Sequence, residues 1–522
     1  MIPFMTKFWM GLALIALVAH AKGVRVDAGL LEGGVGLDPS IRVFRGVPFA
    51  APPVGPLRCA PPQPVKAWKG VRAADKFAAH CVQARVFDDI IFRGEMSEDC
   101  LNLTVWTPAK SGREQLPVYV WFYGGGFTAG GGDEPRYDGE SIARHGIVVV
   151  NVNYRLGVFG FFAHPELTAE SPHKASGNYG FLDQVAALQW VRKNIAAFGG
   201  DPRKVTIGGE SAGSLSVSAL MASPLSRDLF QQAIGESGAF FGSVGGRATP
   251  LLTETERQGS AFAAAVGAKS LAELRASPAD KLLQEASKPS GGFASWPSVD
   301  GYFLTGDVAS VFAQGKQAKV PLLAGWNADE VRMMVTLARE KPTAQTFSEQ
   351  LKRTFKDHAD DARKVYPAST DPEAVRSSGD LASDNFIVHG SWKWLELQAK
   401  AGVPVYRFQF DRQVPIPEAR KTQGLTTLGA AHASELEYVY ETFDSKKADW
   451  QPEDHTVGRT MNAYWANFIK TGNPNGAGLA DWPEFGKSRF VMHLDVESRA
   501  KRDDDRARQE FLESVLAGTG SR

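Results

Sequence analysis

The sequence predicts an α/β fold in which a mostly parallel, twisted central sheet carries helices on both faces. Two observations lead to this prediction. From about residue 117 onward, short runs rich in β-branched and aromatic residues alternate with longer stretches of helical periodicity. One such run, Val205-Thr206-Ile207-Gly208, enters Gly209-Glu210-Ser211-Ala212-Gly213 and then a small-residue segment that can start a helix. Strands that alternate with helices form parallel sheets, so both observations indicate the same architecture.

The first 21 residues are interpreted as a signal peptide that is not part of the fold. Lys7 provides the positive charge, the apolar run Phe8 to Ala19 follows, and Ala19-His20-Ala21 forms an A-x-A cleavage site. The run is too short for a permanent membrane anchor; the alternative is a buried N-terminal helix. We therefore expect Sec-type export to the periplasm or the medium, with a mature chain that begins near Lys22.

The remaining elements follow in chain order. A small N-terminal sheet is expected over 24–60. A helix is expected over 182–198, because apolar residues recur there with a helical period and Gly199-Gly200 ends the pattern. Charged stretches with helical character are interpreted as two insertions, near 240–310 and 335–400, that form a cap over the site. The strands of the parallel sheet are expected at 118–123, 147–152, 204–208, 320–324 and 404–410.

The composition excludes several classes of partner. Basic and acidic residues each number 58, so the formal net charge is zero, and no long run of either sign occurs. Neither nucleic acid nor an anionic membrane surface is therefore an expected partner. No second apolar run is long enough for a membrane anchor, and no C-x-x-C or H-E-x-x-H spacing supports a metal site. The oligomeric state stays open.

Three cysteines, Cys59, Cys81 and Cys100, are present, and the sequence alone allows three pairings. In an oxidising compartment, a bond between Cys81 and Cys100 would close a loop of about twenty residues and stabilise the fold by about 3 kcal/mol. Cys59 would then remain as a small, buried hydrophobic residue.

Ser211 is the candidate nucleophile. A strand, a sharp turn and a helix around G-x-S-x-G place a serine at a strained position with its hydroxyl exposed. The alternative is an ordinary turn. A second glycine run, Gly124-Gly125-Gly126, directly follows a predicted strand. Glycines let backbone N–H groups approach an oxyanion closely, so Gly125 and Gly126, together with Ala212 after the serine, are the candidate donors. Alone, the run would equally fit a flexible loop.

A serine nucleophile on this fold is followed in the chain by an acid and then a histidine. His432 is the candidate base because it lies in a small-residue loop after the strand at 404–410. His358, in a charged helical stretch, fits a solvated helix face better. Glu330, just past the strand at 320–324, is the candidate acid, and Asp329 is its rival. Either carboxylate would fix the histidine tautomer and stabilise the imidazolium.

Together these motifs resemble the type-B carboxylesterase/lipase family, the cholinesterase-like branch of the α/β-hydrolases, in its bacterial, exported form. The resemblance covers most of the mature chain. Two family signatures are matched by Ser97 to Trp106 and by Phe198 to Gly213, and the segments Asn153 to Gly157 and Gly177 to Gly180 are also similar. The resemblance implies one α/β-hydrolase domain over 22–522, in place of the two or three domains that length alone suggests.

The resemblance also implies serine-dependent hydrolysis of small-molecule carboxylic esters by Ser211, Glu330 and His432, without a cofactor. It implies supporting roles for further residues: oxyanion binding by Gly125, Gly126 and Ala212, a second layer around the histidine from Glu210 and Ser237, a disulfide between Cys81 and Cys100, and structural ion pairs Arg58–Glu98 and Arg155–Asp183.

The sequence departs from the family pattern at three places. Val331 follows Glu330 where glycine is usual, and Cys59 replaces an aromatic residue. The segment between Cys81 and Cys100 contains no tryptophan, whereas cholinesterases place a choline-binding tryptophan there. A cholinesterase activity is therefore rejected.

Two rival functions remain. The same machinery would serve hydrolysis of thioesters, lactones, carbamates or amides. A catalytically silent binding or adhesion protein is disfavoured because all three triad residues are present. The identity of the natural ester is not encoded in any motif of the predicted cap.

Overall fold

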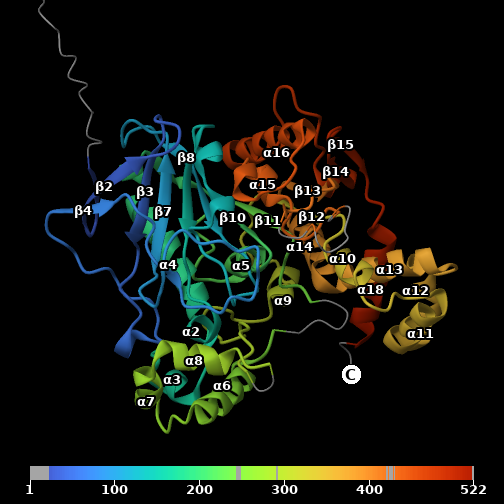
Figure 1. The fold of residues 1–522 in the computed structure, drawn as a ribbon, viewed down its shortest axis with the longest axis horizontal. Helices are drawn as coiled ribbons and strands as arrows, with labels where there is room; N and C mark the ends of the chain where they lie inside the picture. Colours follow the sequence, from blue (N-terminus) through green and yellow to red (C-terminus); the bar gives the residue numbers. More distant parts are fainter. Residues whose placement is uncertain are drawn as a thin grey trace, which may run out of the picture.

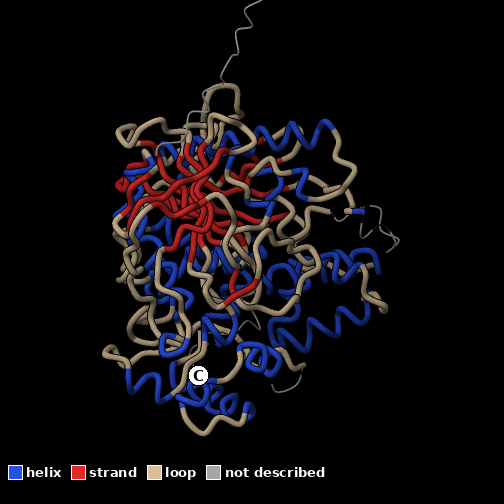
Figure 2. Tube along the Cα trace, turned by 60° about the vertical axis from the view of Figure 1, so that its left-hand side comes forward, coloured by secondary structure: helices blue, strands red, loops and turns tan. Residues whose placement is uncertain are grey.

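A computed structural model describes residues 23–242, 249–289, 292–418, 421, 427 and 429–519. The predicted signal peptide lies outside the described residues. Within them, thirteen strands form one central sheet, in the order β1-β2-β3-β7-β9-β8-β10-β11-β12-β13-β14-β15, with β4 paired to β2. In Figure 2 the strands gather into one body with helical segments around it. The strands are β1 Val24–Val26, β2 Gly29–Val35, β3 Arg42–Pro48, β4 Val71–Ala74, β7 Asn102–Thr107, β8 Leu116–Phe122, β9 Val148–Val152, β10 Gly200–Glu210, β11 Gln232–Glu236, β12 Leu322–Asn327, β13 Val405–Phe410, β14 Phe490–Leu494 and β15 Arg499–Arg502.

Every neighbouring pair from β9 to β14 is parallel. Antiparallel pairs close both ends of the sheet, from β1 to β9 on one side and between β14 and β15 on the other. Most residues of the central strands are buried, and β9 and β12 are buried at every residue. Such strands read as continuous apolar runs because helices cover both faces. The predicted fold class is confirmed.

Helices cover the sheet in two layers, visible around the strands in Figure 1. Helices α4, α5, α9 and α14 pack together on one face, and α1, α15 and α16 on the other. The helices of these layers are α1 Glu140–Ala143, α2 Gly157–Phe161, α4 Tyr179–Asn194, α5 Ala212–Ala222, α9 Val308–Ala313, α14 His389–Lys400, α15 Leu436–Val439, α16 Pro452–Thr471 and α17 Phe485–Ser488. None of the described helices is long and apolar enough to cross a bilayer.

Two further groups of helices have small hydrophobic cores of their own. The first core joins α2 and α3 to α6, α7 and α8 through Phe162, Leu167, Phe262, Leu274 and Leu282. The second joins α11, α12 and α13 to the C-terminal helix α18 through Phe347, Leu351, Leu381 and Leu512. In Figure 1 these groups lie at the bottom and at the right of the sheet. Their helices are α3 Pro165–Glu170, α6 Leu252–Val266, α7 Leu271–Ala276, α8 Ala279–Ala286, α10 Arg332–Thr336, α11 Ala344–Phe355, α12 Ala359–Val365, α13 Asp371–Ser383 and α18 Arg506–Thr519.

The expected element boundaries are close to the observed ones, with three differences. The strand expected at 320–324 runs from Leu322 to Asn327, because Pro321 lacks an N–H and the register with β13 continues to Asn327. The strand expected at 204–208 reaches Glu210, one residue before the candidate nucleophile. The helix expected at 182–198 begins earlier, at Tyr179, and ends in a 3₁₀ turn before the left-handed Gly199.

Candidate active site

Ser211 lies at the point where β10 turns sharply into α5. Its backbone has φ 52° and ψ −120°, a conformation that L-residues rarely adopt. The flanking glycines are sterically required: a Cβ at Gly213 would lie 1.9 Å from the Phe122 carbonyl oxygen, and one at Gly209 would lie 2.4 Å from the Gly213 carbonyl carbon. The strained turn of the predicted nucleophile is therefore present, with β8 packed against its back.

The structure brings Ser211, His432 and Glu330 together although they are far apart in the sequence. Ser211 Oγ lies 2.9 Å from His432 Nε2, and Glu330 Oε2 lies 2.6 Å from His432 Nδ1. Both distances are those of hydrogen bonds. The three side chains therefore form one continuous hydrogen-bonded chain from hydroxyl to imidazole to carboxylate.

The loops that carry the acid and the histidine are joined through their backbones. Glu330 follows β12, and His432 lies in the segment after β13, the neighbouring parallel strand. The His432 N–H donates to the Glu330 carbonyl oxygen at 2.9 Å. Adjacent parallel strands end at the same edge of the sheet, which is why the two loops meet at the carboxyl ends of β12 and β13.

Glu330, rather than its rival Asp329, faces the imidazole. Its second oxygen, Oε1, accepts hydrogen bonds from the Ser237 hydroxyl at 2.6 Å and from the Asn327 N–H at 2.8 Å. Asp329 instead pairs with Arg332 and accepts the Ala430 N–H. The Glu330 carboxylate is thus held by fixed donors on one oxygen and offers the other to the histidine.

Two carboxylates control the charge of His432. Glu210 Oε1 lies 3.2 Å from His432 Nε2, on the nitrogen that also faces Ser211. Burial lowers the pKa of His432, but Glu210 and Glu330 raise it by more, to about 9. Burial in turn raises the pKa of Glu210 to about 7, partly opposed by His432 and Arg136. The site therefore stabilises an imidazolium strongly.

The glycine run lies beside the candidate nucleophile. A Cβ at Gly124 would lie 3.1 Å from Ser211 Cβ and 2.6 Å from Glu210 Oε2, so only glycine fits there. Gly125 and Gly126 both have positive φ, 97° and 63°. Ala212 is the first residue of α5, so its N–H has no partner within the helix. These backbone groups are the predicted oxyanion donors.

The other predicted contacts also form. Cys81 and Cys100 are joined by a disulfide, and Cys59 is a free, buried thiol whose pKa is raised by burial to about 11. The Arg155–Asp183 ion pair is buried and bidentate. The Arg58–Glu98 pair joins the base of the disulfide loop to the preceding segment. Val331 has φ −110°, so the position where glycine is usual does not require glycine in this chain.

Sequence reasoning missed three residues of this region. Asn327, the last residue of β12, donates to the Ala431 carbonyl at 2.7 Å and to the Glu435 carboxyl group, which ties the acid loop to the histidine loop. Glu435 is fully buried, and burial raises its pKa to about 8. Phe386 packs its ring against the imidazole at 5.0 Å. Glu435 lies only three residues after His432, and this short spacing could have indicated it. No pattern in the sequence marks Phe386.

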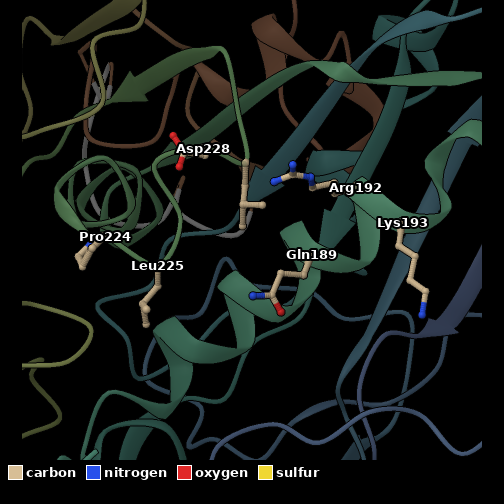
Figure 3. A pocket seen from close by; sticks show the side chains of 7 residues that line it. Gln189, Arg192, Lys193, Pro224, Leu225 and Asp228 are labelled. Carbon is tan, nitrogen blue, oxygen red and sulfur yellow. The ribbon is translucent and has the colours of Figure 1, made fainter.

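A surface hollow of about 530 Å³ lies between α4 and the segment after α5 (Figure 3). Arg192, Lys193 and Asp228 line it together with uncharged residues, and no triad residue takes part. In Figure 3 the Lys193 side chain extends away from the other labelled residues. The hollow therefore offers no convergent set of charged groups, in contrast to the site around Ser211.

Comparisons with known proteins identify the family of the chain and its fold. The model of the Carboxylesterase family matches residues 20–512. A fumonisin B1 esterase of Sphingopyxis macrogoltabida is 35% identical over 498 residues, which cover 93% of this chain and 89% of that protein. A solved PNB esterase superposes with a TM-score of 0.80 at 32% identity, over 94% of this chain and 99% of the other. For a Geobacillus stearothermophilus carboxylesterase the TM-score is 0.81, at 30% identity over 94% and 100% of the two chains. The chain therefore belongs to the Carboxylesterase family, has the α/β-hydrolase fold, and is a carboxylic ester hydrolase.

Proposed function

We propose that this chain hydrolyses carboxylic esters through an acyl-enzyme on Ser211, with His432 as general base and acid and Glu330 as the triad acid. The single observation that carries the proposal is the continuous chain of hydrogen-bonding distances, 2.9 Å from Ser211 Oγ to His432 Nε2 and 2.6 Å from His432 Nδ1 to Glu330 Oε2. A serine hydroxyl becomes a useful nucleophile when a positioned base removes its proton.

In the first half-reaction, His432 Nε2 takes the Ser211 proton as Oγ attacks the ester carbonyl. The Glu330 carboxylate holds the Nδ1–H, fixes the tautomer and stabilises the imidazolium that forms. The imidazolium then gives its proton to the leaving alcohol oxygen. In the second half-reaction, water attacks the acyl-enzyme with the same histidine as base, and the acid is released.

Backbone donors complete the proposed site. The N–H groups of Gly125, Gly126 and Ala212 would hold the oxygen that becomes negative in the tetrahedral intermediate. Such donors stabilise the transition state because they are already oriented before the charge develops. Ser237 and Glu210 act through other residues, Ser237 by fixing the Glu330 carboxylate and Glu210 by raising the pKa of the imidazole.

The proposal extends to the whole chain. We infer that the mature protein is a single hydrolase domain, that the helical groups near 240–310 and 335–400 act as its cap, and that the chain is exported. The disulfide supports export, because such bonds persist in oxidising compartments. The natural substrate is then a small-molecule ester that reaches the protein outside the cytoplasm.

The proposal is tested by steady-state hydrolysis of p-nitrophenyl esters with acyl chains of increasing length. Ser211→Ala is expected to lower kcat by about 10⁶-fold, and Glu330→Gln by about 10⁴-fold, with the protein still folded. Asp329→Asn is the matched control, since its carboxylate faces Arg332 and not the imidazole. Equal turnover by Ser211→Ala and the unmodified protein, or a loss in Asp329→Asn that equals the loss in Glu330→Gln, would contradict the assignment.

A parallel series with thioesters, lactones and amides separates the rival substrate classes. An oxygen-ester hydrolase is expected to have its highest kcat/KM on the esters. Ser211-dependent turnover that is faster on another class would replace the proposed substrate while leaving the mechanism in place.

A further inference from the structure

A π-helical turn lies beside the active site. Helices α13 and α14 are continuous through residues Asp384–Val388, which form a π-helix between them. Such turns are rare and occur often at functional sites, because one extra residue in the turn changes the direction of a side chain. Here the middle of the turn carries Phe386.

Phe386 packs directly on the imidazole of His432. The two ring centroids lie 5.0 Å apart with planes at 78°, an edge-to-face arrangement. Phe386 is nevertheless 47% exposed, and the His432 side chain is 23% exposed. Most large aromatic side chains of this protein are buried, so a half-exposed phenylalanine in contact with the histidine leaves apolar ring surface free next to the reacting groups.

The position of Phe386 relates it to one half of the substrate. In the proposed reaction, the alcohol oxygen must reach His432 Nε2 to receive its proton, while the carbonyl oxygen points to the Gly125–Gly126 loop. A group attached to the alcohol oxygen therefore leaves close to the imidazole, against which the half-exposed ring of Phe386 packs.

The turn is held by buried polar contacts from the C-terminal helix. The Gln509 amide contacts both of its ends: Nε2 donates to Asp384 Oδ1 at 2.7 Å, and Oε1 lies 3.1 Å from Nδ1 of His389, the residue after the turn. Arg508 pairs with Asp384 Oδ2 at 2.6 Å, and the Tyr366 hydroxyl donates to the same oxygen. Gln509, Asp384 and His389 are fully buried.

We propose that Phe386 is the specificity residue for the leaving alcohol, and that α18 fixes it against His432 by clamping both ends of the π-helical turn through Gln509. The inference rests on the proposed ester hydrolysis. The favoured substrates are then esters whose alcohol part is apolar and bulky or aromatic, because such an alcohol covers the exposed ring of Phe386 before it leaves.

The test varies the alcohol while the acid stays the same. The methyl, benzyl and 2-naphthylmethyl esters of butyric acid give one common acyl-enzyme, so deacylation is the same for all, and kcat/KM reports acylation and alcohol release. Phe386→Ala is expected to lower kcat/KM for the two aryl-alkyl esters by about tenfold relative to the methyl ester. A second series of methyl esters with acetyl, butyryl and octanoyl groups is expected to keep its order of preference.

Phe386→Leu keeps an apolar side chain against the imidazole, so its kcat/KM for the aryl-alkyl esters relative to the methyl ester is expected to lie between those of the unmodified protein and Phe386→Ala. This variant also replaces Phe386→Ala in the test if the alanine variant does not fold. Val496→Ala, at a half-exposed apolar side chain between β14 and β15, is the control and should leave both series unchanged. A loss in Phe386→Ala that is equal for all three alcohols, or a change in the acyl series instead, would overturn the alcohol assignment.

The clamp is tested separately on the same helix. Gln509→Ala is expected to reduce the preference for the aryl-alkyl esters in the same direction as Phe386→Ala, by about threefold, and to add nothing further in the double variant. Glu510→Gln, at the exposed neighbour, should have no effect. Gln509→Met serves if the alanine variant does not fold. An unchanged alcohol preference in a folded Gln509 variant would overturn the clamp.

The two proposals fail in different ways. If ester hydrolysis by Ser211 were wrong, Ser211→Ala would cleave the butyrates as fast as the unmodified protein. If only the present inference were wrong, turnover would depend on Ser211 but the effect of Phe386 would not depend on the alcohol.

Discussion

At the residue scale, the environment of His432 sets the conditions for catalysis. A general base must be neutral to accept a proton, yet the carboxylates of Glu210 and Glu330 raise the pKa of this imidazole to about 9. The same attraction stabilises the imidazolium that forms when Ser211 is deprotonated. His432 therefore binds the Ser211 proton more strongly, but a larger fraction of His432 is already protonated at neutral pH and cannot act as the base.

The pH profile follows from these shifts. Because His432 must lose a proton before it can act as the base, kcat/KM should rise with pH through the pKa of His432. Glu210→Gln removes one of the two carboxylates that raise this pKa, so the acid limb should move to lower pH by about one unit. Assays of kcat/KM between about pH 5 and about pH 10 measure the position of this limb.

Asp329→Asn is the control for this profile, because Asp329 pairs with Arg332. A limb that stays in place in Glu210→Gln, or that moves to higher pH, would show that Glu210 does not set the charge of His432.

The residues of the site were predictable where a motif or a chain order restricts them. Ser211 is marked by flanking glycines that the turn requires, and His432 by a small-residue loop after a strand. The sequence favoured Glu330 over Asp329 but left Asp329 as a rival, since the choice depends on which side chain receives the Ser237 hydroxyl and which receives Arg332. The role of Phe386 could not be predicted from the sequence, because no local pattern marks the π-helical turn that carries this side chain to His432.

At the scale of elements, the loop closed by the Cys81–Cys100 disulfide is attached to the rest of the protein at more than one point. It contains the short strand β6 Met96–Ser97, which pairs with β5 His80–Cys81. Asp89 in this loop lies 3.8 Å from Arg136, which also pairs with the buried Glu437 after the histidine loop. The disulfide therefore closes this loop at its base, and the Asp89–Arg136 ion pair attaches its middle to the rest of the protein.

The disulfide should contribute to stability chiefly through the unfolded chain. The double variant Cys81→Ser/Cys100→Ser is expected to lower the free energy of unfolding by about 3 kcal/mol, because the cross-link closes a loop of nineteen residue steps. Urea unfolding under non-reducing conditions measures the change. Cys59→Ala, which removes the free thiol alone, is the comparison; a loss as large as that of the double variant would mean that the cross-link is not the source of the stability.

The elements that the sequence revealed are those with strong local signals. The buried strands β8, β9 and β13 are runs of β-branched and aromatic residues, and α4 has a clear period and a glycine stop. Strand β11, Gln232–Glu236, was not anticipated because a five-residue strand with a polar residue at each end has no periodicity to detect. Strands β14 and β15, at the end of the sheet, are similarly short.

At the scale of the whole molecule, the C-terminal helix joins parts of the chain that are distant in sequence. Leu512 on α18 is fully buried in the same hydrophobic core as Phe347, Leu351 and Phe355 of α11. Arg508 on the same helix pairs with Asp384. No pattern in the sequence assigns α18 to this group, since docking of a terminal helix depends on tertiary packing and not on local propensity.

Leu512→Ala should therefore destabilise the second helical group. We expect a loss of about 2–5 kcal/mol in the free energy of unfolding, from the lost apolar contacts and the cavity that remains. Thermal and urea unfolding followed by circular dichroism measure it, with Glu510→Ala on the exposed face as the control. A change within about 0.5 kcal/mol would indicate that α18 is not packed as described.

The most direct test of the central claim is the site of covalent labelling by a p-nitrophenyl phosphonate ester. An activated serine displaces p-nitrophenolate and keeps the phosphonyl group on its oxygen. We predict one adduct per chain by intact mass, located on Ser211 by peptide mapping, with loss of esterase activity in proportion to labelling and no adduct in Ser211→Ala. Labelling at another residue, or full inactivation with Ser211 unmodified, would contradict the account.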